Sequence, residues 1–315
     1  MTRLRSLALV GLALALCGCG TSAVRHGTVQ RTPSPVTALR RGPPIHIAVI
    51  VMENEEYGDI IGSQQTPFIN TLARRYALAR SMYAITHPSL PNYLALTGGD
   101  TFGIDSDCTD CRVASATSLS DQLSDARLSW KAYMEGLPRP CYRGARAGDY
   151  AKKHDPFVYY GRVVQNPVQC GHVVPLTQLA HDETARTLPR FTWITPNLCH
   201  DMHDCAPSRG DAFLARLVPP LLAALGRRGL LVLTWDEGTT DDGCCRRAGG
   251  GHIATILAGP AARGGARLSA PVDQYSILQT IEDLLKLRRL RGAACACTPS
   301  LAPLLSGVTR SRSSR

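Results

Sequence analysis

The chain has 315 residues, of which 44% are hydrophobic and 19% are charged. This length and composition are typical of a globular protein with one large domain or two small ones, and they exclude a disordered or fibrous chain. The formal net charge is +10, but the basic excess lies near the two ends, and the interior lacks a basic stripe interleaved with aromatics, so nucleic acid is not expected as a partner.

Residues 1–18 predict an export signal. Arg3 and Arg5 precede an apolar run at residues 7–16 that is too short to span a bilayer. Gly18-Cys19 then resembles a bacterial lipoprotein signal, with Cys19 as the lipidated first residue of the mature chain. We expect a lipoprotein on the outer side of the cytoplasmic membrane or, if the signal is an ordinary cleaved one, a secreted protein.

Residues 19–44 are rich in Thr, Ser, Pro, Gly and Arg without periodicity, which predicts a flexible tether. Basic residues beside a lipid anchor suit an anionic membrane surface, although solvated termini explain them equally well. Ten cysteines follow Cys19, and an even number in an exported chain favours disulfides. Cys108/Cys111 and Cys199/Cys205 are close in sequence, but spacing does not determine the pairing, and zinc ligation by cysteine is the weaker alternative.

A domain of alternating strands and helices is predicted at residues 45–290, followed by a basic tail rich in Cys, Ser and Arg at 291–315. The predicted strands are 45–52, 81–85, 130–134, 191–195, 230–235 and 253–258, and the predicted helices are 66–73, 90–96, 118–128, 211–225 with an interruption at Pro219-Pro220, and 274–287. Residues 136–188 show no periodicity and are interpreted as an insertion or the rim of a site. The pattern predicts the α/β class with a mostly parallel sheet covered on both faces.

Acidic and amide residues follow two of the buried strands. The first strand ends in Glu53-Asn54 and the strand 230–235 ends in Asp236-Glu237. Ligands bind at the carboxyl ends of strands in open α/β sheets. Acid pairs are often merely solvated, but a carboxylate beside a buried sheet is costly unless a partner such as a metal ion neutralises it. Oxygen ligands favour Mg²⁺, Ca²⁺ or Mn²⁺ over Zn²⁺, so we expect one such divalent cation.

Ser89 stands at a predicted helix start, in the segment His87-Pro88-Ser89-Leu90-Pro91-Asn92. A serine in this position commonly caps the helix. However, a helix N-terminus also attracts anions, and a serine hydroxyl beside a cation is an effective nucleophile toward phosphorus. His87 and Asn92 add polar groups beyond the needs of a cap.

Two further segments bring histidines near strand ends. His200, Asp201 and His203 lie in a nine-residue segment after the strand 191–195, and His252 follows three glycines before the strand 253–258. The plainer interpretations are a polar loop closed by Cys199 and Cys205, and a structural histidine.

Together these motifs, with Lys153-His154-x-Pro156 and Gly210-Asp211-Ala212, resemble the bacterial phosphoesterase family, which contains secreted acid phosphatases and phospholipases C. The resemblance covers about residues 45–287 and is strongest to short acid phosphatases that act on phosphoinositides. It implies an alkaline-phosphatase-like, three-layer α/β/α sandwich.

The resemblance also implies roles for individual residues. By this resemblance Ser89 would be the nucleophile and Asn92 would hold a phosphate oxygen, while Glu53, Asn54, Asp236 and Glu237 would match metal-binding positions. His203 and His252 would match positions that bind substrate, protonate the leaving group or hold a second metal. We expect both histidines to be catalytic, with His203 as the general acid, and we expect Ser89 to be a metal ligand as well. The expected substrate-binding residues are Asn92, His87, His200 and Asp201. The wider superfamily often has Asp-His where this chain has Asp236-Glu237, which argues against a two-zinc centre.

We therefore expect a metal-dependent phosphomonoesterase that works through a phosphoserine intermediate on a phosphorylated small molecule or a phosphoinositide. One alternative is a phospholipase C-type phosphodiesterase acting on phospholipid headgroups. The other is a surface lipoprotein that binds a phosphorylated ligand without catalysis.

Overall fold

The computed structural model describes residues 45–245 and 247–307. The predicted signal at 1–18, the tether at 19–44 and the lipidation site Cys19 lie outside the described residues. Within the described part of the chain, no helix has the length and apolar character needed to cross a membrane.

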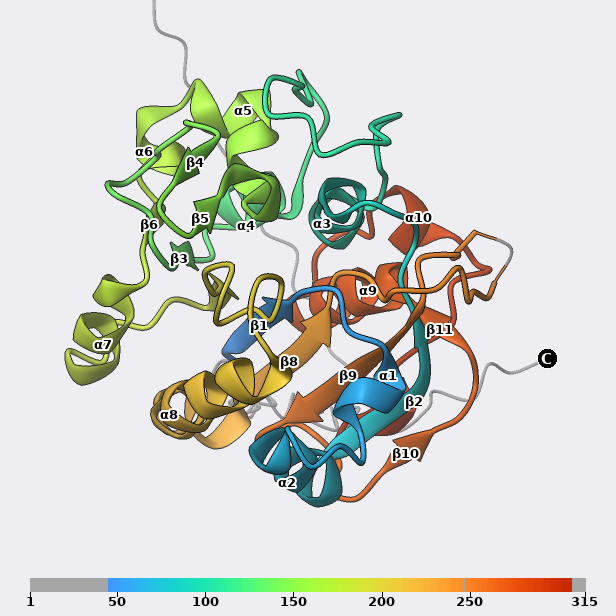
Figure 1. Cartoon of the computed structure of the whole chain (residues 1–315). Helices are drawn as coiled ribbons and strands as arrows, with labels where there is room; N and C mark the ends of the chain where they lie inside the picture. Colours follow the sequence, from blue (N-terminus) through green and yellow to red (C-terminus); the bar gives the residue numbers. More distant parts are fainter. Residues whose placement is uncertain (1–44, 246, 308–315) are drawn as a thin grey trace, which may run out of the picture. The chain divides into compact units, whose positions relative to one another are not determined.

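Nine strands form one sheet in the order β10-β2-β9-β8-β1-β7-β3-β6, with β11 paired to β2 (Figure 1). Their bounds are β1 Ile47–Met52, β2 Ala77–Tyr83, β3 Trp130–Met134, β6 Val173–Pro175, β7 Phe191–Thr195, β8 Leu230–Trp235, β9 His252–Ala258, β10 Arg267–Leu268 and β11 Val272–Asp273. Every pairing is parallel except those of β9 with β2 and β8. The mostly parallel sheet is thus confirmed.

The centre of the sheet consists of β8, β1 and β7, whose residues are all buried. Strands β1 and β8 are the continuous apolar runs of the sequence, and such runs suit strands that are covered on both faces, whereas β7 also carries the buried Thr192 and Thr195. Six residues of β1 pair in register with β8, from Ile47 opposite Leu230 to Met52 opposite Trp235. The carboxyl ends of these two strands therefore lie side by side.

Helices cover both faces of the sheet (Figure 1). On one face α2 and α7 pack against α8, and on the other α9 packs against α3 and α10 while α4 packs against α3. The helices are α1 Tyr57–Ile60, α2 Pro67–Arg75, α3 Ser89–Gly98, α4 Leu119–Asp125, α5 Gly161–Val164, α6 Pro167–Cys170, α7 Thr177–Thr184, α8 Pro207–Leu225, α9 Gln274–Leu285 and α10 Arg291–Ala294. The predicted three-layer α/β/α sandwich is confirmed.

Four segments differ from the prediction. The strand expected at 81–85 is β2, Ala77–Tyr83, four residues earlier at its start. Helix α8 continues through Pro219 and Pro220, because both rings are exposed while Leu214, Val218 and Leu221 on its other face are buried. That burial outweighs the roughly 3 kcal/mol that an interior proline costs a helix.

The stretch 136–188, expected to be irregular, forms short elements. It contains the hairpin β4 (Arg146–Ala147) and β5 (Tyr150–Ala151), the 3₁₀ helix η1 (Lys152–His154), helices α5 to α7 and the edge strand β6. Residues 291–307, assigned from sequence to the tail, contribute α10, which packs on α9, and the buried Leu301 and Leu304.

The ten described cysteines form five disulfides: Cys108–Cys111, Cys141–Cys170, Cys199–Cys205, Cys244–Cys245 and Cys295–Cys297. Two of them are the close pairs noted in the sequence. Because each of these cysteines is bonded to another, they are not zinc ligands in this structure.

The buried carboxyl of Glu282, on α9, makes the stability of the protein depend on pH. Burial raises the pKa of its carboxyl to about 8, although the Leu290 N–H donates to Oε1 at 2.9 Å. Between pH 4.5, its ordinary pKa, and about 8, the folded protein holds a proton that the unfolded chain releases. Stability therefore falls as pH rises through this window.

We expect Glu282→Gln, which keeps the acceptor and cannot ionise, to remove part of this loss. Urea unfolding at pH 5 and pH 8 in a chelator should show a variant more stable than wild type at pH 8 by about 1 to 3 kcal/mol, with little difference at pH 5. Asp105→Asn, at an exposed acid, is the control. An equal loss of stability in the variant and wild type would contradict this account.

Candidate active site

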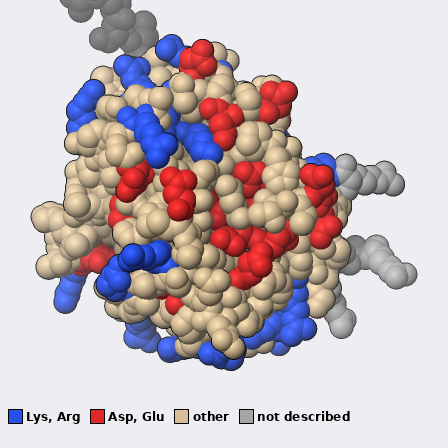
Figure 2. Space-filling view, viewed as in Figure 1, with Lys and Arg blue, Asp and Glu red and all other residues tan. Residues whose placement is uncertain are grey.

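The candidate site lies at the carboxyl edge of the central strands. Glu53 directly follows β1, Asp236 and Glu237 follow β8, and Asp201 lies in the loop after β7. Because β8, β1 and β7 are adjacent and parallel, these four acids from distant parts of the chain converge at one edge. Figure 2 shows acidic side chains gathered over the middle of the face drawn, with basic side chains mainly toward its periphery.

Ser89 is the first residue of α3, and its side chain is fully buried. Its Oγ lies 3.2 Å from Glu53 Oε2 and 3.2 Å from Glu237 Oε1. The helix has no side-chain cap, so the capping interpretation of Ser89 does not hold. A hydroxyl has one hydrogen and can donate to only one carboxylate at a time. Two acids at this distance are therefore more than the hydroxyl needs for its own hydrogen bonding.

Glu53 is the centre of the group. The Tyr93 hydroxyl donates to its Oε1, and His154 Nε2 lies 3.1 Å from its Oε2. His154 Nδ1 in turn lies 3.3 Å from Asp201 Oδ2. The ligand atoms of Glu53, His154 and Asp201 all lie within 4.8 Å of one another, so this buried trio is able to hold a metal ion.

The electrostatics of the group indicate a missing positive charge. Burial raises the pKa of Glu53 well above its ordinary value, and the neighbouring Asp236 and Asp201 raise it further. Burial raises the pKa of Asp236 to about 8, with Glu237 adding to the shift, and burial also raises the pKa of Asp201. Burial lowers the pKa of His154, so its imidazole does not supply the charge. A divalent cation would reverse the preference of these acids for protons.

Four buried polar atoms of the site lack a hydrogen-bond partner among the described residues: Asn54 Oδ1, Asp201 Oδ2, Asp236 Oδ2 and His154 Nε2. Buried polar atoms are rarely left unpaired. Their types, mostly oxygens beside one imidazole nitrogen, fit a hard divalent cation. The donors come from both the predicted ligand set and the Glu53–His154–Asp201 trio, and Glu53 belongs to both.

His87 binds the opposite side of Glu237 from Ser89. Its Nδ1 lies 2.5 Å from Glu237 Oε2, and its Nε2 lies 3.0 Å from the carbonyl oxygen of Thr240. Burial alone would lower the pKa of His87, but the hydrogen bonds to Thr240 and Glu237 outweigh it and raise the pKa. The predicted substrate-binding residue is thus in contact with the site through Glu237.

Asn92, expected to hold a phosphate oxygen, makes other contacts. Its Oδ1 accepts from the backbone N–H groups of Ile85 and Thr86, and its Nδ2 donates to the carbonyl oxygens of Thr86 and Pro88. These four bonds occupy the amide and shape the turn that carries Ser89. In this structure Asn92 therefore positions Ser89 rather than pointing a free amide toward a ligand.

The other predicted histidines differ in their surroundings. His203 lies beside the cluster, with its ring 5.6 Å from that of His154, and its Nδ1 is 2.7 Å from Asp204 Oδ1. His200 instead lies 2.9 Å from Glu135 and stacks on Phe213.

His252 is at the same edge of the sheet, but it stacks between Tyr57 and Tyr83 and is 2.7 Å from the carbonyl oxygen of Arg80. Among the described residues, the rings of His200 and His252 contact these aromatic, acidic and backbone groups rather than Ser89 or Glu53.

Sequence reasoning missed Tyr93 and His154 as partners of Glu53. Tyr93 lies four residues after Ser89 on α3, so helical spacing places both on one face, which was a usable signal. His154 lies in the aperiodic stretch and was noted only as part of the Lys153-His154-x-Pro156 motif.

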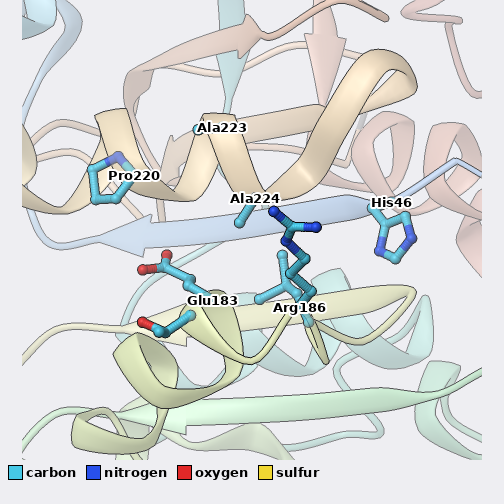
Figure 3. A pocket seen from close by; sticks show the side chains of 8 residues that line it. His46, Glu183, Arg186, Pro220, Ala223 and Ala224 are labelled. Carbon is cyan, nitrogen blue, oxygen red and sulfur yellow. The ribbon is translucent and has the colours of Figure 1, made fainter.

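A cavity of ≈ 550 Å³ lies elsewhere in the fold (Figure 3). His46, Glu183, Arg186 and Pro220 are among its lining residues. Since His46 immediately precedes β1 and Glu53 follows it, this cavity is at the opposite end of that strand from the acid cluster. It is a separate feature.

Residues 62–288 match the model of the phosphoesterase family. The chain is 33% identical over 285 residues to a phosphatidylinositol-3-phosphatase of Mycobacterium tuberculosis. The aligned region covers 90% of this chain and 89% of that protein. It is also 33% identical over 229 residues to an acid phosphatase of Aspergillus fumigatus, covering 70% of this chain but 51% of that one.

The fold is similar to that of a Vibrio parahaemolyticus protein of the alkaline phosphatase superfamily, with a TM-score of 0.58, 12% identity, and coverage of 81% of this chain and 71% of that one. It is also similar to murine ectonucleotide pyrophosphatase / phosphodiesterase 5, with a TM-score of 0.54, 13% identity, and coverage of 83% and 100%. At these identities the similarity concerns the fold alone.

The unpaired donors predict that a divalent cation stabilises the protein. We expect saturating Mn²⁺, Mg²⁺ or Ca²⁺ to raise the melting temperature of chelator-treated protein by about 5 °C, by mass action on the folded state. Glu53→Gln should abolish the shift, since Glu53 belongs to both donor sets.

Two further variants separate the donor sets in the same melting experiment. Asp236→Asn should remove most of the shift and Asp201→Asn less than half of it, as the ligand set predicted from sequence requires. The reverse order would assign the cation to the Glu53–His154–Asp201 trio, and no shift with any of the three cations would contradict both.

Proposed function

The chain belongs to the phosphoesterase family, and from that premise we propose that it is a metal-dependent phosphomonoesterase that works through a phosphoserine intermediate on Ser89. The observation that carries the proposal is the buried Ser89 hydroxyl, held between Glu53 and Glu237 at the start of a helix. The relatives named as phosphatases support monoester hydrolysis over the phosphodiesterase and the non-catalytic alternatives.

In the first step the Ser89 Oγ attacks phosphorus and its proton passes to the carboxylate pair. The acceptor is one of the two carboxylate oxygens that lie 3.2 Å away, Glu53 Oε2 or Glu237 Oε1. As the Oγ–P bond forms, the bond from phosphorus to the leaving oxygen breaks. The N-terminus of α3 stabilises the negative charge that gathers on the phosphoryl oxygens.

His203 is the proposed general acid for the leaving oxygen. Its Nδ1 lies 2.7 Å from Asp204 Oδ1, which fixes the ring, and its Nε2 accepts from the Lys153 ammonium at 3.2 Å in the resting protein. Nε2 therefore carries the proton for the leaving oxygen only once Lys153 has turned away. An imidazole nitrogen both donates and accepts protons, so it gives one to the leaving oxygen and takes one from the attacking water in the second step. Water then attacks the phosphoserine, phosphate leaves, and Ser89 regains its proton from the carboxylate pair.

The proposed ligands of the cation are Glu53, Asn54, Ser89, Asp236 and Glu237, with His154 and Asp201 as the adjoining donors. When bound, a divalent cation lowers the pKa of a coordinated hydroxyl and neutralises phosphate charge. We propose Mg²⁺, Ca²⁺ or Mn²⁺, because the donors are mostly oxygens.

The proposed substrate is a phosphorylated small molecule or a phosphoinositide, after the relatives' names. The proposed location is outside the cytoplasm, and the five disulfides support an oxidising compartment. Membrane attachment through Cys19 remains a prediction.

The test is phosphate release from p-nitrophenyl phosphate. We expect Ser89→Ala to lose roughly 10³-fold or more in kcat, the size of effect seen when a nucleophile is removed, while the exposed control Ser269→Ala stays at wild-type rates. Chelation should abolish phosphate release by the wild type. Adding back each cation separately should then identify the one that supports activity.

The intermediate is tested by rapid acid quench of wild type during turnover. Mass spectrometry should find one phosphoryl group on the peptide containing Ser89. Full activity in Ser89→Ala would refute the serine mechanism, and full activity after exhaustive chelation would refute the metal requirement.

A further inference from the structure

Asp107 lies next to Ser89 but has no part in the proposed reaction. It lies in the segment between α3 and α4, directly before the Cys108–Cys111 disulfide. Its Oδ1 accepts the backbone N–H of Leu90 at 3.0 Å, and Leu90 directly follows Ser89. The free N–H groups at a helix start are donors suited to an anion. A carboxylate of the chain itself is therefore bound beside the nucleophile.

The second oxygen of Asp107 is paired with Lys153. Oδ2 lies 2.9 Å from Lys153 Nζ, and the same Nζ is 3.2 Å from His203 Nε2. Lys153 belongs to η1 and immediately precedes His154, whose buried Nε2 has no hydrogen-bond partner. The two oxygens of the Asp107 carboxylate thus contact a helix N–H and an ammonium. This contact lies beside the acid cluster that contains the unpaired polar atoms.

The strength of the pair argues against a mainly structural role. The side chains of Lys153 and Asp107 retain 22% and 27% of their exposure. An ion pair that keeps contact with solvent contributes less to stability than a fully buried one. Opening this pair is consequently inexpensive, and an incoming anion with more charge than a carboxylate is able to replace Asp107.

We infer that Asp107 holds the place of the substrate phosphate in the resting protein, and that Lys153 is a phosphate-binding residue that exchanges Asp107 for substrate. The inference rests on the proposed function, because it concerns a phosphate bound at Ser89. On binding, one phosphate oxygen takes the Leu90 N–H and another takes the Lys153 ammonium, and Asp107 turns outward. Lys153 then also lies between the phosphate and His203, the proposed acid.

The test is calorimetric titration of the cation-loaded protein with inorganic phosphate. Asp107→Ala should bind phosphate about 3- to 10-fold more tightly than wild type, because no resident carboxylate has to leave and a repelling charge is gone. Asp107→Asn, which keeps an acceptor for the Leu90 N–H, should show a smaller gain. Lys153→Met should bind about 10-fold more weakly, and Lys153→Arg should restore most of the affinity.

The alternative, a pair that only supports the fold, makes a different prediction. Asp107→Ala and Lys153→Met would then weaken phosphate binding alike, and either that result or an unchanged affinity in Asp107→Ala would overturn the inference. Asp283→Ala, which opens the exposed Arg289–Asp283 pair at the end of α9, is the matched control and should leave phosphate affinity unchanged.

Kinetics separate binding from positioning. For p-nitrophenyl phosphate, Lys153→Met should raise KM about 10-fold with a smaller change in kcat. A fall in kcat at constant KM would mean that Lys153 acts only through His203, and would overturn its role as a phosphate ligand.

The calorimetric result does not depend on turnover. Tighter phosphate binding in Asp107→Ala together with an active Ser89→Ala would refute the serine mechanism and leave the phosphate site standing. An inactive Ser89→Ala with unchanged binding in Asp107→Ala would support the serine mechanism and refute the exchange of Asp107 for phosphate.

Discussion

Glu53 is a carboxylate without exposed surface at the end of the central strand, and the polar part of this fold is arranged around it. An unpaired buried charge costs several kcal/mol even after the protein relaxes. The hydroxyls of Ser89 and Tyr93 on α3 meet that demand in part, and the imidazole of His154 on η1 lies 3.1 Å from Oε2 without forming a hydrogen bond. Since His154 also contacts Asp201, the loop after β7 is tied to the same carboxylate. The packing of α3 and η1 on the sheet and the chemistry of the site therefore depend on one residue.

Much of the framework was predictable because it depends on local pattern. The apolar runs of β1 and β8 have no amphipathic alternative, so they have to be buried on both faces. Once these strands are parallel neighbours, Glu53 and Asp236-Glu237 meet at one edge. The position of Ser89 likewise followed from the helix start and the family resemblance.

The remainder depends on neighbours that are distant in sequence. His154 joins Glu53 only through the folding of an aperiodic segment, and His252 is separated from the cluster by two tyrosine rings. The backbone contacts of Asn92 have a related origin. A side-chain amide satisfies backbone groups as readily as a ligand, and four such groups lie within its reach.

Strand β9, which runs antiparallel to its neighbours in the large sheet, affects how this fold accommodates insertions and deletions. Because β9 runs against β8, the chain leaves the sheet after Trp235 and returns at His252 on the same edge, without a crossover. The described residues of this connection are 236–245 and 247–251, of which Asp236 and Glu237 belong to the acid cluster and the Thr240 carbonyl contacts His87. Insertions or deletions in its exposed part, residues 239–243, alter neither the strand register nor the helical layers. Evolution can thus enlarge or narrow the mouth above the acids, and so alter which molecules enter, independently of the framework that holds the nucleophile.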